Sequence, residues 1–255
     1  MAILEKIRGM TWMEAVALGL IQGMSRIVIY GNNPDVDTAT TPEDVWNGGG
    51  LYNFMTGATT LEVVSSNVND SSSGTGARTI SVTGLDTSYT PFTENVTLNG
   101  TTAVALANQY FRINDARILS AGSNLVNSGD ITIRDSGAGT TRAILPTGYG
   151  ATRQAVYTVR VGYSMYIEDI LINVNKPTGT QDATVSLYTG FPAQGFYRMP
   201  IEITVSSHPH LNKTNAGLLL PEKTDFMMRC TGVGSNNTNV SAAFIGILID
   251  KTLLV

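Results

Sequence analysis

Side chains that catalyse reactions or bind phosphate are scarce in this chain. Only 14% of its 255 residues are charged, and it has two histidines and one cysteine, whereas a typical soluble domain is about a quarter charged. The formal net charge is -4, and binding to nucleic acid needs clustered lysine and arginine. We therefore expect no nucleic-acid partner.

The single cysteine, Cys230, excludes an internal disulfide. Its neighbours are Phe226, Met227 and Met228, and a cysteine among apolar residues usually behaves as a small buried side chain. The sequence therefore predicts that Cys230 is a core residue and not a nucleophile.

The chain also lacks a long uninterrupted hydrophobic run. Residues 9–24 are largely apolar and follow Lys6 and Arg8, but Glu14 interrupts them and no small-residue cleavage site follows. About 20 apolar residues would be needed to span a bilayer, and a signal peptide ends in a cleavage site. Neither export nor insertion into a membrane is expected.

The same stretch has the spacing of an amphipathic helix. An apolar stripe recurs every three or four residues, with Trp12 and Val16 beside it, and its members are Met10, Met13, Ala17, Leu20 and Met24. Such a stripe must be covered. Two interpretations remain open: the helix packs on the chain's own β core, or it is an arm that docks on a neighbouring subunit.

After a short predicted strand at 26–30, residues 31–57 change in character. Pro34, Pro42 and the glycines at 48–50 oppose regular structure, yet the segment carries several large apolar residues. We expect an extended connector that lies against a surface, with a turn at 41–44. Residues 1–57 are thus predicted to form a helix and extended arm, with these candidate interface residues: Met10, Trp12, Met13, Leu20, Met24, Trp46, Leu51, Tyr52 and Phe54.

From residue 58 onward the hydrophobic pattern has a period close to two, which predicts β-strands. Turn signals such as Asn99-Gly100 separate them, and no long helical stretch intervenes. Strands are predicted at 61–66, 78–84, 94–98, 110–119, 130–134, 141–145, 154–161, 165–175, 183–188, 195–205, 225–231 and 240–250. The predicted fold is all-β, with antiparallel β-sandwich or jelly-roll units.

The β region divides near Gly148-Tyr149-Gly150. The predicted units are 58–150 and 151–255, the second resembling a jelly roll. One continuous sandwich remains an equal alternative, because no long linker divides the two halves.

No candidate metal site is complete. His208 and His210 lack further ligands for zinc or copper, and Asp35 and Asp37 lie in a Pro/Thr-rich connector. The acids around 130–135 lack the spacing of an EF-hand. We expect no bound metal and no cofactor.

No catalytic residues are predicted either. Glycoside hydrolysis needs two carboxylates held across a cleft, and the acids on predicted strands give no sign of converging; these are Glu168, Asp169, Glu202 and Asp225. We expect a chain that is not an enzyme.

Four segments together resemble virion structural proteins of tailed bacteriophages. They are PDVDTATTPEDVWNGGGLYNF, TLEVVSSNVNDSSSGTGARTISVTGLD, VTLNGTTAVALANQYFRINDARI and GDITIRDSGAGTTRAILPTGYGATRQAVYTV. The resemblance covers roughly residues 33 to 175. It implies a β-rich, non-enzymatic particle component made in the host cytoplasm, with the virion as its final location, whose partners are copies of itself and other virion proteins.

The sequence leads to two hypotheses of different classes. The first is a homo-oligomer that decorates the head or forms a collar or adaptor between head, tail and fibres. The second is a carbohydrate-binding β-sandwich that recognises a host surface glycan through exposed aromatics, namely Tyr163, Tyr166, Tyr188, Phe191, Phe196 and Tyr197.

Overall fold

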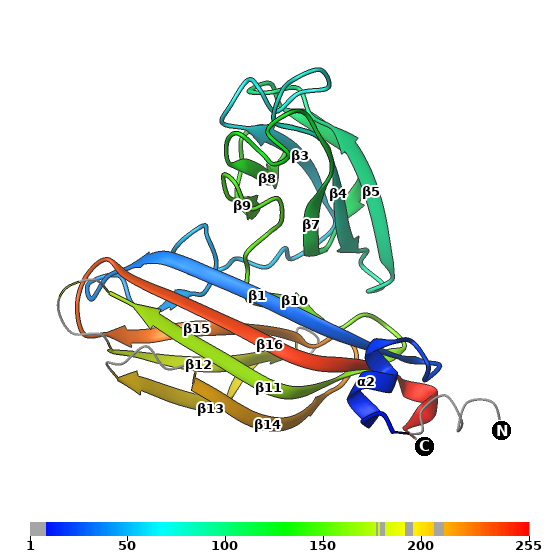
Figure 1. Cartoon of the computed structure of the whole chain (residues 1–255), viewed down its shortest axis with the longest axis vertical. Coiled ribbons are helices and arrows are strands. Elements are labelled where there is room, and N and C mark those ends of the chain that lie inside the picture. Colours follow the sequence, from blue (N-terminus) through cyan, green and yellow to red (C-terminus); the bar gives the residue numbers. More distant parts are fainter. Residues whose placement is uncertain (1–8, 177, 179–181, 192–195, 207–211, 255) are drawn as a thin grey trace.

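The chain folds into two antiparallel β-sandwiches, one above the other in Figure 1. This computed structural model describes residues 9–176, 178, 182–191, 196–206 and 212–254. The predicted all-β class is confirmed, since every pairing between named strands is antiparallel. Within the described ranges, no helix has the length and apolar character needed to cross a membrane.

The lower sandwich is a jelly roll made of two facing sheets. The first sheet has the order β1 (Met24–Val36), β16 (Thr238–Asp250), β11 (Tyr163–Asn175) and β14 (Asn212–Leu220). The second has the order β10 (Val156–Thr158), β15 (Asp225–Val233), β12 (Asp182–Phe191) and β13 (Phe196–Ser206), and β2 (Glu43–Asp44) also pairs with β15.

One edge of the second sheet consists of two pieces. Strand β10 pairs with β15 at residues 225–227, and β2 pairs with the same strand at 229–230. The two short strands β10 and β2 therefore lie end to end along the same edge of β15. The upper sandwich is inserted between them, at residues that separate β2 from β10.

The inserted sandwich has a four-stranded and a three-stranded sheet. The first has the order β6 (Val104–Tyr110), β3 (Thr59–Ser65), β8 (Ile131–Asp135) and β9 (Thr141–Leu145). The second has the order β5 (Pro91–Thr97), β4 (Ala77–Leu85) and β7 (Arg112–Ala121).

Each sandwich has its own apolar core. In β3 the residues Leu61, Val63 and Ser65 are buried in alternation with less buried neighbours, as expected for a strand with one face on a core. Ile80, Ile131 and Ile133 belong to the upper core, whereas Ile167, Phe226 and Phe244 belong to the lower one. Two separate cores make the sandwiches two structural domains.

The N-terminal segment differs from the predicted arm. Strand β1 pairs with β16 from Met24 to Val36, so this part of residues 1–57 belongs to the jelly roll. The lower domain therefore begins well before residue 151, and the upper domain is an insertion. The reason is that the apolar residues of β1, such as Ile29 and Val36, complete the core that β16 and β11 begin.

The predicted helix over residues 9–24 is limited to α2 (Trp12–Ala17). Thr11 and Glu14 form a capping box at its start: the Glu14 carboxylate accepts from the Thr11 N–H at 2.7 Å, and the Glu14 N–H donates to the Thr11 hydroxyl at 3.3 Å. Gly19, directly after the C-cap residue Leu18, has a φ of 69°, and this left-handed backbone ends the helix.

Most predicted strands are present within a few residues of their expected ends, and 141–145 coincides with β9. Three expectations were wrong. The predicted strand 110–119 joins the last residue of β6 to β7, strand β14 and the rest of β6 were not predicted, and the expected turn at 41–44 contains strand β2.

Candidate functional site

A buried ion pair joins the two domains. Arg112 on β7 of the upper domain donates to Asp225 on β15 through Nε at 2.8 Å and Nη2 at 2.7 Å. The two side chains are only 4% and 1% exposed. The hydroxyl of Thr158 donates to the same carboxylate at 2.5 Å, so the charges of both partners are well satisfied.

Further hydrogen bonds fix the domains on either side of this ion pair. The Asn114 amide donates to the Thr158 carbonyl at 3.0 Å and accepts from the Thr158 N–H at 3.0 Å. At the tip of the β4–β5 hairpin, the Tyr89 carbonyl accepts from the N–H of Val161 at 3.0 Å. The two sandwiches are therefore held at several points and not by a single linker.

The chain segment that enters the upper domain is fixed by arginines. Arg112 Nη1 donates to the carbonyl of Met55 at 2.7 Å, and Arg142 Nη1 donates to the carbonyl of Asn53 at 2.5 Å. The Arg112 guanidinium also lies over the rings of Phe54 and Phe111, at 4.9 and 3.9 Å from their centroids. These contacts order the segment by charge-assisted hydrogen bonds and cation–π contacts.

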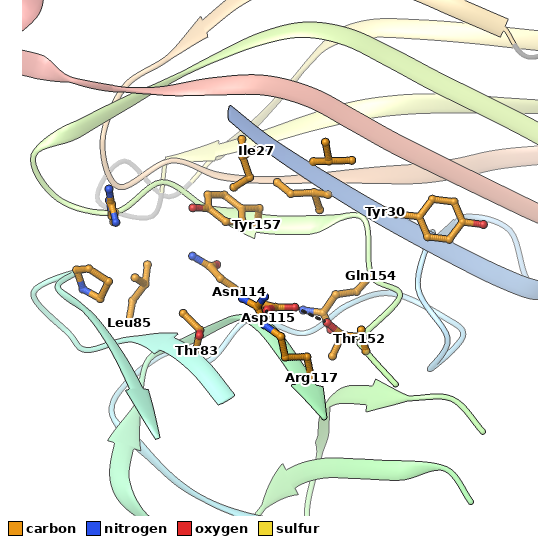
Figure 2. Close-up of a pocket in the computed structure, with 15 residues that line it drawn as sticks. Ile27, Tyr30, Thr83, Leu85, Asn114, Asp115, Arg117, Thr152, Gln154 and Tyr157 are labelled. Atoms are coloured by element: carbon orange, nitrogen blue, oxygen red, sulfur yellow. Dashed lines mark hydrogen bonds and ion pairs between the residues drawn. The ribbon is translucent and has the colours of Figure 1, made fainter. Parts of the chain in front are cut away.

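A cleft of about 450 Å³ lies between the two domains. Figure 2 shows β1 along its upper side, Tyr157 and Gln154 beside it, and the ends of β4 and β7 below, with Thr83, Leu85, Asn114, Asp115 and Arg117. The lining residues contributed by β1 are Ile27, Val28, Ile29 and Tyr30.

The edge of β1 that faces away from β16 has unpaired backbone groups. The N–H of Asn32 donates away from β16, to the carbonyl of Arg153 at 3.2 Å. Since N–H groups in a strand alternate in direction, those of Arg26, Val28 and Tyr30 point to the same outer side. Over the described residues, β1 pairs with β16 alone, and the backbones of these three residues make no hydrogen bond on the outer side.

Several polar side chains line this cleft. Asp115 pairs with Arg117 at 3.0 Å, and the two side chains are 37% and 63% exposed. Burial raises the pKa of the Tyr157 phenol to about 12, which keeps it protonated at neutral pH. The Gln154 Oε1 is buried with no hydrogen-bond partner, although its amide nitrogen donates to the carbonyl of Ile113 at 3.3 Å.

Helix α2 covers one end of the outer face of the first jelly-roll sheet (Figure 1). Val16 packs there with Ile247 and Ile249, and Met13 and Met24 lie against the same cluster. The other side of the helix is exposed: Met10 is 42%, Trp12 50% and Leu18 63% exposed. Leu20 is partly buried. Packing on the chain's own sheet agrees with the first interpretation of the apolar stripe. The large apolar side chains that stay exposed leave the second, docking on a neighbouring subunit, open.

The remaining candidate interface residues lie close together on the second sheet of the jelly roll. Trp46 and Tyr52 are 5% and 6% exposed and pack with Val156 and Met227. Phe54 is partly buried against them, and only Leu51, at 52% exposed, faces solvent. Trp46 and Tyr52, named as candidate interface residues of the arm, are thus covered by the chain's own β10 and β15.

The aromatic residues named for glycan binding are mostly separate. Tyr166 packs in the cluster below α2, and Tyr163 is covered by the Arg160 guanidinium, 3.7 Å from its ring centroid. Tyr188 and Tyr197, in contrast, line one hollow on the second sheet. The side chains of Phe191 and Phe196 lie outside the described residues.

The other residues considered for chemistry have structural environments. Cys230 is fully buried, and burial raises the pKa of its thiol to about 11. The described residues contain no group of three or more potential metal ligands; His208 and His210 lie outside them. Asp37 accepts from the N–H of Asn237 at 2.6 Å, while Asp35 N–H donates to Asn33 Oδ1 at 3.1 Å.

The carboxylates considered for hydrolysis do not converge. Asp225 is bound by Arg112, and Glu202 accepts from the Ser186 hydroxyl at 3.0 Å. Both lie on the second jelly-roll sheet, whereas Glu168 and Asp169 are on β11 in the first.

Sequence reasoning missed the residues that join the domains. Nothing local distinguishes Arg112, Asn114 or Thr158 from other polar residues of strands, and Asp225 was considered only as a possible catalytic acid. The one available signal was low charge content, which makes each arginine and aspartate in an apolar strand a candidate for a buried pair.

No family model matches the sequence, and no curated protein matches it. Among solved structures, the infectious bursal disease virus VP2 subviral particle aligns at 12% identity and a TM-score of 0.20, over 89% of this chain and 72% of that chain. T=1 particles derived from infectious bursal virus align at 12% identity and a TM-score of 0.24, over 90% and 70%. With TM-scores this low, neither alignment establishes a shared fold, and no function is transferred from them.

Proposed function

We propose that this chain is a non-enzymatic structural subunit of a virus particle. It assembles as a homo-oligomer that decorates the head of a tailed bacteriophage, or forms a collar or adaptor at the head–tail junction that supports tail or fibres. Its partners are copies of itself and other virion proteins. It is made in the host cytoplasm and needs no cofactor, nucleic acid or membrane.

The observation that carries this proposal is the unpaired edge of β1. Three residues, Arg26, Val28 and Tyr30, direct free N–H and C=O groups outward beside an interdomain cleft. Native proteins usually cover or blunt such an edge, because it is a template for another strand. An extended segment of a neighbouring copy can pair with it by β-strand addition.

Two of the exposed side chains at this edge, those of Val28 and Tyr30, are apolar or aromatic, whereas that of Arg26 is charged. Val28 is 56% and Tyr30 40% exposed. Leu219, which is 49% exposed, lies on β14 at the opposite edge of the same sheet. Together with Trp12 and Leu18 of the helical region they form a discontinuous apolar surface. Contiguous apolar patches mark sites of association; these side chains stand apart from one another, so the open edge of β1 is the stronger support.

Fold and rigidity support the same role. Jelly rolls occur in viral capsid proteins and also in lectins and cupins, so the fold permits a structural role without determining it. The buried pair of Arg112 and Asp225 fixes one domain on the other. A subunit with a rigid joint transmits one geometry to each neighbour, which closed symmetric assembly requires.

The test is to block the β1 edge without disturbing the core. Val28→Pro removes an outward N–H that takes no part in the ladder with β16, and proline is tolerated at such edge positions. Val28→Thr keeps both the N–H and the β-branched shape and is the matched control. We expect wild type and Val28→Thr to give the same oligomer by native mass spectrometry, and Val28→Pro to shift toward monomer.

Two results would contradict the proposal. One is a wild-type chain that stays monomeric at micromolar concentration and that occurs only as separate single copies in the purified particle. The other is an oligomer that is unchanged in Val28→Pro and equally unchanged in the double variant Trp12→Ser, Leu18→Ser. This double variant alters exposed side chains only. Electron cryomicroscopy of the particle would then assign head, collar or adaptor from the symmetry of the ring.

A further inference from the structure

The second sheet of the jelly roll carries a hollow of about 390 Å³ on its outer face. Its walls come from the segment that enters the upper domain, through Leu51 and Asn53, and from three neighbouring strands, through Tyr188, Tyr197 and Arg229. Strands β12, β13 and β15 lie side by side in this sheet (Figure 1). The hollow is therefore built on paired strands and not on loops alone.

Tyr197 forms a flat aromatic floor in this hollow. It is paired with Gly190 across β12 and β13, and a Cβ at Gly190 would lie only 2.3 Å from Tyr197 Cε1 and 2.7 Å from Cδ1. The ring thus occupies space that only glycine leaves open. Tyr197 is nevertheless 50% exposed, so part of the ring remains uncovered by the protein.

A fixed hydrogen-bond donor lies beside this ring. The Arg229 guanidinium is 4.6 Å from the centroid of the Tyr188 ring, and its Nε donates to Asp44 at 2.7 Å. Its Nη2 donates to the other Asp44 oxygen at 3.1 Å. These contacts occupy one side of the planar fork, and Arg229 Nη1 has no hydrogen-bond partner among the described residues.

The charge of this donor is already compensated. Asp44 is fully buried, and although burial raises its pKa, hydrogen bonds from Arg229 act in the opposite direction. The exposed side chain of Asn53 provides an amide nearby. An aromatic face, a neutralised guanidinium and an amide suit a neutral ligand with one apolar face and several hydroxyl groups better than an anion.

We propose that this hollow binds a neutral hexopyranose unit of a polysaccharide. The C–H face of the sugar stacks on Tyr197, while ring hydroxyls accept from Arg229 Nη1 and exchange hydrogen bonds with the Asn53 amide. This activity is separate from assembly, because the hollow lies on the second jelly-roll sheet and the β1 edge belongs to the first.

The test uses the full chain on an array of neutral oligosaccharides of glucose, galactose, mannose and N-acetylglucosamine, followed by calorimetric titration of the best binder. We expect Tyr197→Ala to weaken binding about tenfold, since an aromatic contact contributes up to about one such factor. Tyr197→Phe keeps the ring and should bind within about threefold of wild type.

Gly190→Ala separates ring position from ring chemistry. The added methyl group displaces the Tyr197 ring from its position next to Gly190. We therefore expect the same loss of affinity as in Tyr197→Ala, although the tyrosine is still present. Tyr149→Ala is the matched control, because Tyr149 is 61% exposed and is not part of the hollow. Circular dichroism and thermal unfolding check that each variant is folded.

Absence of binding to every oligosaccharide on the array would overturn the proposal. Binding that Tyr197→Ala and Gly190→Ala leave unchanged would also overturn it, since the sugar would then bind elsewhere. Because the array reads sugar binding and native mass spectrometry reads assembly, failure of this proposal is distinguishable from failure of the structural role.

Discussion

Arg112 and Asp225 are separated by 113 positions in the sequence and form a bidentate ion pair between the two domains. Both are shielded from solvent, and Arg112 also donates to the carbonyls of Met55 and Phe111 at 2.7 Å. One arginine thus connects the inserted domain, the segment that enters it and the jelly roll.

Arg112→Met should strongly destabilise the chain. Removing one partner of a buried pair leaves an uncompensated charge on Asp225, and such losses cost about 3–5 kcal/mol. Urea unfolding measures the effect. Arg117→Met is the control, because Arg117 is 63% exposed in its pair with Asp115 and should change the free energy of unfolding by less than about 1 kcal/mol. Equal effects of the two substitutions would contradict the bridging role of Arg112.

Gly31→Ala should also destabilise the jelly roll. A Cβ at Gly31 would lie 2.1 Å from the N of Ala155 and 2.2 Å from the carbonyl oxygen of Val45, and backbone on both sides cannot yield easily. We expect a loss of about 1–3 kcal/mol or more. Gly57→Ala, which meets nothing within 4 Å, should leave the thermal midpoint nearly unchanged, and a comparable loss there would mean that Gly31 is not specially constrained.

Glu62 gives the upper domain a defined dependence on pH. Its carboxylate accepts from the N–H of Gly137 at 3.0 Å, from Arg134 Nε at 2.7 Å and from the N–H of Ala138 at 3.1 Å. These hydrogen bonds hold the pKa of Glu62 below its ordinary value of 4.5. A lowered pKa in the folded state means that the stabilisation is present above the unfolded pKa and is lost as pH falls through the folded one.

Glu62→Gln should therefore flatten the loss of stability below pH about 4.5. Denaturant unfolding of wild type and variant, measured across this range, checks the prediction. Parallel curves for the two proteins would contradict it.

Cys230 should be unreactive in the native chain. It is fully buried, and burial raises the pKa of its thiol to about 11, so little thiolate forms at pH 8. Alkylation by iodoacetamide, followed by mass spectrometry, should be slow in buffer and rapid in 6 M guanidinium, a roughly saturating denaturant for such domains. Rapid labelling of the folded chain would contradict the assignment of Cys230 to the core.

The sequence by itself determined the local β-structure. A period of two in apolar residues gives a strand and selects its buried face, which is why 141–145 was predicted to the residue and Leu61 and Val63 were placed in a strand. The glycines and prolines of residues 31–57 indicated an irregular segment, but residues 31–36 belong to β1 and 43–44 form β2. Strand β14, with the sequence NKTNAGLLL, was not predicted because its first half has no apolar alternation.

Only the tertiary structure decided which strands pair and what covers each apolar face. The same pattern that predicts a strand at 26–30 is compatible with a free arm or with a sheet, and pairing with β16, more than 200 residues away, selects the sheet. Likewise, the sequence required that Trp46 be covered, but the strands that cover it follow the inserted domain in the sequence. Local periodicity shows which face of a strand is buried. Which strand or loop covers that face depends on contacts between distant parts of the chain.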